Sequence, residues 1–185
     1  GYHAIQVGEP EVDALRTNRM AHRWLIDANG DADAICEALP FESSTLDLVV
    51  LPHTLERSID AHQSLREVER VLMPEGRVVI AGLNPFSLWA LRQHRYDWAV
   101  RLGVKAGAQS LPFDAPVAQW IGLWRCRDWL KLLGFEVEVV KRGMYRPALD
   151  SERWIDRTGW MESAGSGVWP FAASVYLLVA VKRVR

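Results

Sequence analysis

Four residues of the chain lie at or close to the carboxyl ends of predicted strands, and each suits ligand binding or acid–base chemistry. They are Gly8, Asp27, Glu37 and His53. In a parallel sheet flanked by helices, ligands bind at the carboxyl ends of the strands. Gly8 opens onto a predicted helix N-terminus, which attracts a carboxylate or a phosphate. A histidine at that edge can take a proton from a substrate or position it.

Asp27 and Glu37 have the chemistry of nucleoside binding. Asp27 lies 19 residues after Gly8, and an acid at about that spacing commonly binds both hydroxyls of a ribose. Leu39 and Phe41 could flank a flat aromatic ring, while Glu37 or a nearby backbone group accepts a hydrogen bond from its exocyclic amine.

Each of these residues also has a purely structural interpretation. Gly8 is a single glycine followed by an acid and a proline, so an ordinary strand-to-helix turn explains it as well as a nucleotide loop does. Asp27 equally fits a simple polar turn, and Glu37 a loop that tucks two apolar residues into the core. A lone histidine such as His53 is more often a structural hydrogen-bonding residue. The residues alone leave both interpretations open.

Hydrophobic periodicity predicts the elements that would bring these residues together. In the first half of the chain, strands are predicted over 4–7, 23–27, 33–38, 46–51 and 78–81, with helices starting at 10 and at 61. Asp60 can cap the second helix, and Pro74 is expected to end it. Strand, helix and strand from 46 to 81 form a right-handed βαβ unit.

The second half of the chain predicts one helix, two strands and an insertion. The helix carries Cys126 and Leu130 on one face and ends at Gly134 in the left-handed conformation. Strands follow over 135–139 and 174–181. Residues 84–124 are rich in aromatic and basic side chains and are predicted to be an inserted, lid-like helical segment. This segment could cover an acceptor pocket, rest on a membrane surface or simply pack in the core.

Composition and charge exclude several classes of protein. The chain has 185 residues, 49% of them hydrophobic, which is typical of one globular domain and unlike disordered or collagen-like chains. No apolar run reaches the length of a membrane span, and no Lys/Arg run suggests nucleic acid. Cys36 and Cys126 lack the spacing of a metal site and suit a reducing cytoplasm.

Opposite charges gather in the two halves of the sequence, although the net charge is only −1. Residues 1–75 carry a net charge of −8 and residues 76–185 a net charge of +7. The halves could simply attract each other within one domain, or basic residues around the opening of a binding site could attract an anionic substrate.

A longer pattern joins several of these segments and resembles a known family. Its parts are Leu39–Phe41, Leu46–Val50, His53–Glu56 and Leu65–Ile80. In this order they resemble the class I S-adenosylmethionine-dependent methyltransferases, in particular the small-molecule enzymes related to ubiquinone and menaquinone biosynthesis.

The resemblance implies a fold, a cofactor and a set of site residues. The fold is a Rossmann-like, doubly wound, mostly parallel sheet with helices on both faces and an antiparallel last strand, in a single domain over 1–185. The cofactor is S-adenosylmethionine, and the acceptor is a small molecule, aromatic or hydrophobic in character. By position, the family's cofactor-binding residues fall on Gly8, Asp27, Cys36, Glu37, Ala38, His53 and Thr54.

The same resemblance implies a catalytic role for His53 and a helical cover before the first strand. His53 would take a proton from the acceptor, since methyl transfer otherwise needs mainly the alignment of two reactants. Family members usually carry helical sequence ahead of the first strand, so we expect such a cover to precede residue 1. Only Gly8 remains of the family's glycine-rich loop. The alternative is therefore a non-catalytic binding or regulatory module on the same fold.

Overall fold

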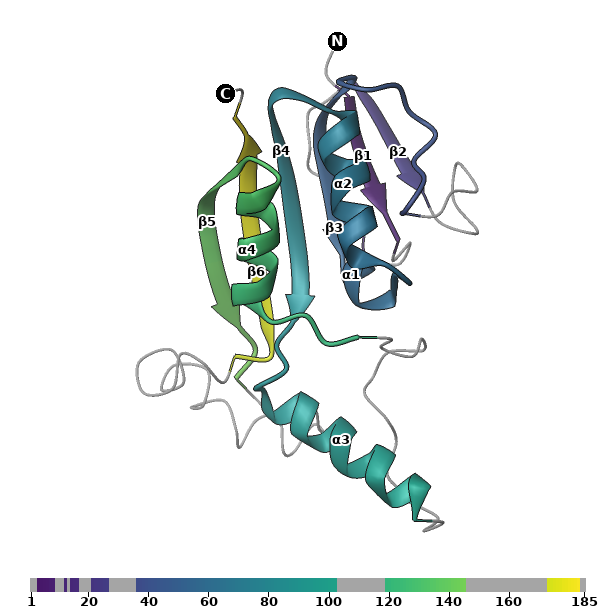
Figure 1. Cartoon of the computed structure of the whole chain (residues 1–185), viewed down its shortest axis with the longest axis vertical. Coiled ribbons are helices and arrows are strands. Elements are labelled where there is room, and N and C mark those ends of the chain that lie inside the picture. Colours follow the sequence, from purple (N-terminus) through teal and green to yellow (C-terminus); the bar gives the residue numbers. More distant parts are fainter. Residues whose placement is uncertain are drawn as a thin grey trace.

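The computed structural model of the chain describes residues 3–8, 12, 14–16, 21–26, 36–102, 119–145 and 173–183. Within that part, six strands form one mixed sheet in the order β2-β1-β3-β4-β6-β5 (Figure 1). The strands are β1 (His3–Val7), β2 (His22–Ile26), β3 (Leu46–Pro52), β4 (Leu72–Leu83), β5 (Phe135–Gly143) and β6 (Val175–Lys182). The first four are parallel, and β6 lies antiparallel between β4 and β5. The predicted Rossmann-like, mostly parallel sheet with an antiparallel last strand is confirmed.

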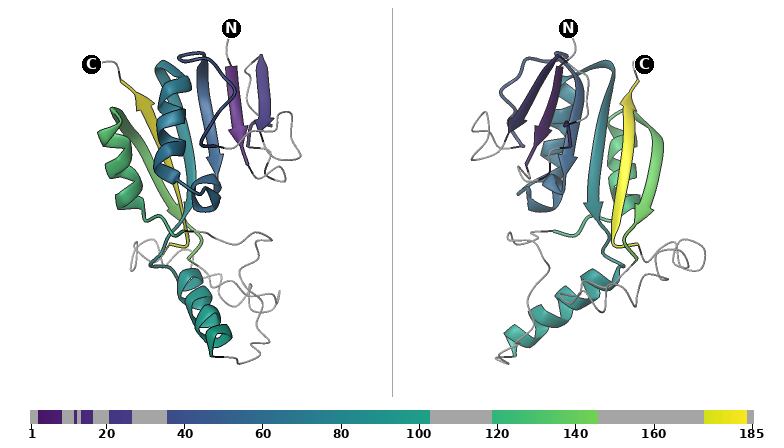
Figure 2. Two further views of the ribbon diagram at one scale, coloured as in Figure 1. Left: turned by 45° about the vertical axis from the view of Figure 1, so that its right-hand side comes forward. Right: turned by 180° about the vertical axis from the view of Figure 1, so that it is seen from behind.

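The described helices are α1 (Thr54–Arg57), α2 (Ala61–Val71), α3 (Leu88–Arg101) and α4 (Leu123–Leu132). Helices α2 and α4 cover the same face of the sheet, and the view from behind shows the strands in front of both (Figure 2). On the other face, buried Leu15 packs with Ala4 and Val50. None of the described helices is long and apolar enough to cross a membrane.

Helix α2 begins where the sequence predicted and ends earlier. The carboxylate of Asp60 accepts hydrogen bonds from the backbone N–H groups of His62 and Gln63, which caps the helix. The helix stops at Val71, before Pro74, because Leu72 already pairs with Leu46 in the sheet. The next pair is Leu48 with Arg77, so the residues between 72 and 77 form a bulge in β4.

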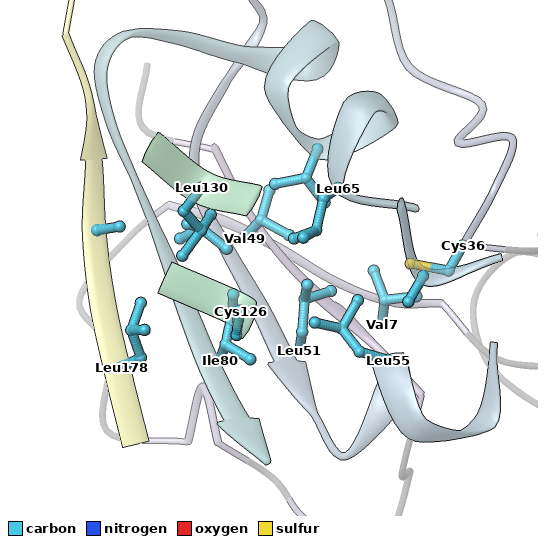
Figure 3. Packing of buried hydrophobic residues seen from close by; sticks show 14 of the residues in the cluster. Val7, Cys36, Val49, Leu51, Leu55, Leu65, Ile80, Cys126, Leu130 and Leu178 are labelled. Carbon is cyan, nitrogen blue, oxygen red and sulfur yellow. The ribbon is translucent and has the colours of Figure 1, made fainter. Parts of the chain in front are cut away.

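The core lies between the sheet and the two covering helices. Leu65 of α2 and Leu130 of α4 are fully buried against strand residues that include Val49 and Ile80 (Figure 3). Helix α4 ends as predicted, with Gly134 at φ 84 in the left-handed region. Strand β5 then continues to Gly143, further than its alternating pattern predicted.

Two other predicted elements differ from the structure or fall largely outside its description. Residues 36–38 form a turn, so the strand predicted over 33–38 is wrong in its described part; 33–35 lie outside the described residues. The reason is local, because Glu37 bonds to the segment that follows α1 and not to a neighbouring strand. Of the helix predicted from residue 10, only positions 12 and 14–16 are described, and 14–16 form a turn.

The predicted insertion contains a helix, α3, that extends away from the carboxyl edge of the sheet (Figure 1). Trp89 and Ala90 at its start are buried, whereas Trp98 and Leu102 near its end are exposed. Its apolar residues are not gathered on one side, so it lacks the segregated apolar face of a helix that rests on a membrane. Residues 103–118 of the insertion lie outside the described residues.

Candidate functional site

The carboxyl ends of β1, β3 and β4 meet at one edge of the sheet, next to α1 (Figure 1). Gly8 follows β1, His53 and Thr54 follow β3, and Asn84 follows β4. The strand order makes β1 and β3 direct neighbours, so Gly8 and Thr54 are brought together from positions 46 residues apart. The strand pattern alone left the order of the strands open, and both residues were expected at the cofactor site only from the family resemblance.

Gly8 makes a tight turn directly against Thr54. Its φ of 79 lies in the left-handed region, and its N–H donates to the carbonyl of Ile26 at 2.7 Å. The hydroxyl of Thr54 donates to the carbonyl of Val7. A Cβ added at Gly8 would lie 3.2 Å from the Thr54 hydroxyl oxygen, closer than side chains normally tolerate. The left-handed turn and the close packing of Thr54 both require glycine here. The turn lies at the carboxyl end of β1, where ligands of such sheets bind, and this place fits the predicted cofactor.

Gln6 supports the segment that follows Gly8 and was missed by the sequence analysis. Its side chain is 2% exposed, accepts a hydrogen bond from the N–H of Ala14 at 2.9 Å and donates to the carbonyl of Val12. The signal was a lone amide side chain in an otherwise apolar strand, because a buried polar group must find partners. Gln6 thus ties Val12 and Ala14 to β1.

His53 lies half-buried at the end of β3 with an unusual backbone conformation. Its φ is 53, and its N–H donates to the carbonyl of Ala81 on β4 at 2.9 Å. Left-handed backbone is uncommon for residues other than glycine, and such strain gathers at functional sites. The conformation places residue 53 at the gap between the ends of β3 and β4.

The segment 36–38, predicted to contact adenine, is a turn in which only Ala38 is exposed. Burial raises the pKa of the Cys36 thiol to about 12, so this thiol stays protonated and unreactive. The carboxylate of Glu37 accepts hydrogen bonds from the Ser58 hydroxyl at 2.6 Å and the Ile59 N–H at 2.9 Å. Partial burial opposes the charge of Glu37, but these bonds and one from the Asp60 N–H outweigh it and lower its pKa.

A salt bridge on α2 holds the next part of this segment. Arg70 and Glu67 pair at 2.8 Å. Arg70 donates to the carbonyls of Leu39 at 3.0 Å and Phe41 at 2.8 Å, and Glu67 accepts from the Leu39 N–H at 3.2 Å. The sequence analysis missed both roles, since an acid and an arginine three residues apart also fit an ordinary exposed pair on a helix.

The predicted site residues therefore fall into three groups. Gly8, His53 and Thr54 lie together at the ends of β1 and β3, and residues 36–38 are tied to the segment that follows α1. Asp27, predicted to bind a ribose, lies outside the described residues. The Cys36 thiol is buried, so a ligand contact there would involve backbone atoms.

Comparisons with known proteins agree with this geometry. A family model described as a methyltransferase domain matches residues 11–80. A solved S-adenosylmethionine-dependent methyltransferase from Mesorhizobium loti superposes with a TM-score of 0.62 at 15% identity, covering 98% of this chain and 91% of that one. A demethylmenaquinone methyltransferase from Streptomyces avermitilis is 37% identical over 76 residues, 41% of this chain and 31% of the relative. Residues 11–80 thus match a methyltransferase domain, and the chain has the fold of the S-adenosylmethionine-dependent methyltransferases.

The chain matches only part of the length of some of its relatives. The uncharacterized protein YafS of Escherichia coli is 32% identical over 143 residues, 74% of this chain and 54% of the relative. The chain thus spans about half the length of that protein. Two further solved structures of the same fold, from Thermotoga maritima and Methanosarcina mazei, are S-adenosylmethionine-dependent methyltransferases, which agrees with the expected cofactor.

Proposed function

We propose that this chain transfers the methyl group of S-adenosylmethionine to a small molecule. The observation that carries the proposal is the bare, left-handed turn at Gly8, pressed against Thr54 at the joined ends of β1 and β3. Thr54 occupies the space that a side chain at residue 8 would need, so this turn is fixed at the edge of the sheet where ligands of such folds bind.

The chain's own residues have separate roles in this proposal. Gly8 gives the cofactor its place at the end of β1, and Thr54 fixes that turn by bonding to Val7. Glu37 and Ala38 present the backbone that faces the adenine, and Asp27 binds the ribose. When bound, the cofactor supplies an electrophilic methyl group on a positively charged sulfur. What the protein must add is alignment of the two reactants.

His53 is proposed to accept the proton that the acceptor loses. It lies at the end of β3, beside the turn at Gly8, and its imidazole is a suitable base near neutral pH. An acceptor that loses no proton on methylation would need His53 only for positioning.

Calorimetry with S-adenosylhomocysteine, the demethylated product, tests the cofactor site directly. We expect the wild-type protein to bind it and Gly8→Ala to bind at least about 10-fold more weakly, because the new Cβ crowds Thr54 and the turn must shift. Gly134→Ala is the matched control. Its φ of 84 is equally left-handed, but a Cβ there meets nothing within 4 Å.

Both glycine variants should lose about 1 kcal/mol of stability from the left-handed backbone, and Gly8→Ala should lose more than that because its Cβ also crowds Thr54. Only Gly8→Ala should lose affinity. Equal losses of affinity in both variants would contradict a specific role of Gly8. A wild-type protein that binds no S-adenosylhomocysteine would overturn the proposed function and support the non-catalytic alternative.

A further inference from the structure

A pocket of about 320 Å³ opens at the same edge of the sheet, on the far side of β4 from Gly8. It lies among the end of β4, the end of β5, the start of β6 and the start of α4. Its walls include Phe86, Trp124 and Tyr176, with Gly122 at the N-cap of α4. Pockets that hold small ligands begin at about this volume.

The pairing of strands places this pocket in line with His53. Tyr176 of β6 pairs with Gly82 of β4 on one side and with Arg142 of β5 on the other. The N–H of His53 donates to Ala81, the residue before Gly82. Neighbouring strands lie about 4.8 Å apart. A molecule that reaches from the end of β4 to Arg142 therefore spans roughly 10 Å, two strand spacings.

The floor of the pocket depends on a glycine opposite a tyrosine. A Cβ added at Gly82 would lie 2.3 Å from the ring of Tyr176. Only glycine at position 82 therefore leaves room for this ring to lie against β4. The Tyr176 hydroxyl donates to the carbonyl of Ile121 at 2.9 Å, and the residue is 2% exposed. The ring is thereby fixed as a flat, rigid wall.

The walls select a ligand of a particular chemistry. They are mostly apolar, and two aromatic side chains remain open to solvent: Phe86 is 82% exposed and Trp124 is 65% exposed. Among the described lining residues, Arg142 is the charged one. A guanidinium has five N–H donors, so it can keep a bond within the protein and still bind an anionic oxygen.

We propose that this pocket binds the methyl acceptor, and that the acceptor is a flat aromatic anion with its acidic group toward Arg142 and its methylated atom toward His53. This inference rests on the proposed methyl transfer and specifies its substrate class. A rigid, two-ring acid fits both the pocket volume and the span of about 10 Å.

Binding of three naphthalene probes tests the charge and shape separately. We expect 2-naphthoate to bind at least about 10-fold more tightly than 2-naphthylmethylammonium, with neutral 2-naphthol in between. Arg142→Gln should abolish the preference for the anion, while Lys141→Gln should leave it intact. Lys141 is the exposed neighbour on β5 that does not line the pocket. An equal preference for the three probes, or no effect of Arg142→Gln, would overturn the assignment.

A pocket-filling variant tests the location. Gly122 has φ −68, and a Cβ there would meet Pro85 at 3.5 Å, an ordinary contact, so Gly122→Phe adds a side chain at the pocket without straining the backbone. It should weaken 2-naphthoate binding at least about 10-fold. Gly143→Phe, at an open position at the end of β5, should not. Undiminished binding in Gly122→Phe would show that the probe binds elsewhere.

Calorimetry with S-adenosylhomocysteine on the same variants separates the two proposals. Neither Gly122→Phe nor Arg142→Gln should change its affinity, because both positions lie beyond β4 from Gly8. Probe binding without binding of S-adenosylhomocysteine would overturn the proposed function. Binding of S-adenosylhomocysteine without selective probe binding would overturn the acceptor pocket alone.

Discussion

Glu56 is a buried carboxyl group with one oxygen left without a hydrogen-bond partner in the described structure. The residue is 1% exposed, and its other oxygen accepts from the N–H of Leu83 at 2.5 Å. Burial raises the pKa of Glu56 to about 7, and the bond from Leu83 only partly offsets this. The neighbouring groups that interact with it are Cys126 and Tyr176, both of which burial also keeps protonated.

This raised pKa predicts that the protein loses stability as the pH rises. Between pH 4.5, the ordinary value, and about pH 7, the folded state holds a proton that the unfolded state has released. The contribution is fully present below pH 4.5 and is lost by about pH 7, a difference of about 3 kcal/mol. Glu56→Gln should remove it and be more stable than wild type at pH 8. Urea unfolding at pH 5, 6, 7 and 8 measures the effect.

Glu42→Gln is the control for this prediction, since it makes the same change of charge at an exposed carboxylate. Its pH dependence should match that of wild type. If Glu56→Gln kept the wild-type slope between pH 5 and 7, another group would be responsible for it.

The sequence predicts where a residue lies in the fold when strand boundaries alone decide its position. Gly8 and His53 were expected at strand ends, and the structure places them there, whereas their roles in binding and catalysis stay predictions. Gln6 and Glu56 were missed because their roles depend on partners, Ala14 and Leu83, that only the folded chain supplies. Periodicity reports which face a residue occupies, whereas buried hydrogen bonds are a tertiary property.

At the scale of elements, α2 positions the predicted adenine-side segment as well as covering the sheet. Arg70 bonds to two carbonyls of that segment, and its pair with Glu67 keeps the guanidinium in place. The hydrogen bond and charge of Glu67 raise the pKa of Arg70, and the same contact lowers the pKa of Glu67. A helix side chain thus controls the shape of a loop 29 to 31 residues away.

Arg70→Ala should therefore loosen this loop without touching the cofactor. We expect about 3- to 10-fold weaker binding of S-adenosylhomocysteine, faster amide exchange at Leu39, and a stability loss of about 1 kcal/mol. Calorimetry and hydrogen exchange measure these effects. Arg70→Lys should restore them only in part, because an ammonium cannot bond to both carbonyls in the same fork.

Arg66→Ala is the matched control, one helical turn earlier on an exposed position of α2. It removes the same charge and should leave both the loop and the affinity unchanged. Equal losses in the two variants would mean that charge on α2, and not the bonds to the loop, affects binding.

The elements themselves were predictable where a strong periodic pattern met a local cap. Helix α2 has a periodic apolar face and is capped by Asp60, and α4 has a periodic apolar face and ends at Gly134. The end of α2 and the turn at 36–38 were misplaced, because tertiary pairing decided them. Leu72 is drawn into the sheet beside Leu46, and the carboxylate of Glu37 is drawn to Ser58. The hydrophobic pattern of the sequence does not indicate either of these contacts.

At the scale of the whole molecule, the last strand of the chain lies inside the sheet. Strand β6 pairs with β4 on one side and β5 on the other. Its last residue, Lys182, bonds to the carbonyls of Glu69 and Leu72 and pairs with the Glu69 carboxylate at 2.9 Å. Arg183 pairs with Glu75 and Glu136. The Lys182–Glu69 and Arg183–Glu75 pairs join the two halves of the sequence, as one interpretation of the charge asymmetry predicted, whereas the Arg183–Glu136 pair lies within the second half.

This topology predicts the order in which parts of the sheet exchange their amide hydrogens. An interior strand opens only when both neighbours separate from it, whereas an edge strand can open alone. We expect β6 to exchange as slowly as β3 and β4, through global unfolding. Edge strands β2 and β5 should exchange on the order of 10-fold faster or more.

The comparison of β5 with β6 is internally matched, since the two strands are hydrogen-bonded neighbours in the same half of the chain. Hydrogen exchange followed by mass spectrometry at several denaturant concentrations resolves the two routes, because global unfolding depends steeply on denaturant and local opening does not. If β6 exchanged as fast as β5, the last strand would be only loosely docked. The pocket wall formed by Tyr176 would then lack the rigidity that selective binding of a flat acceptor requires.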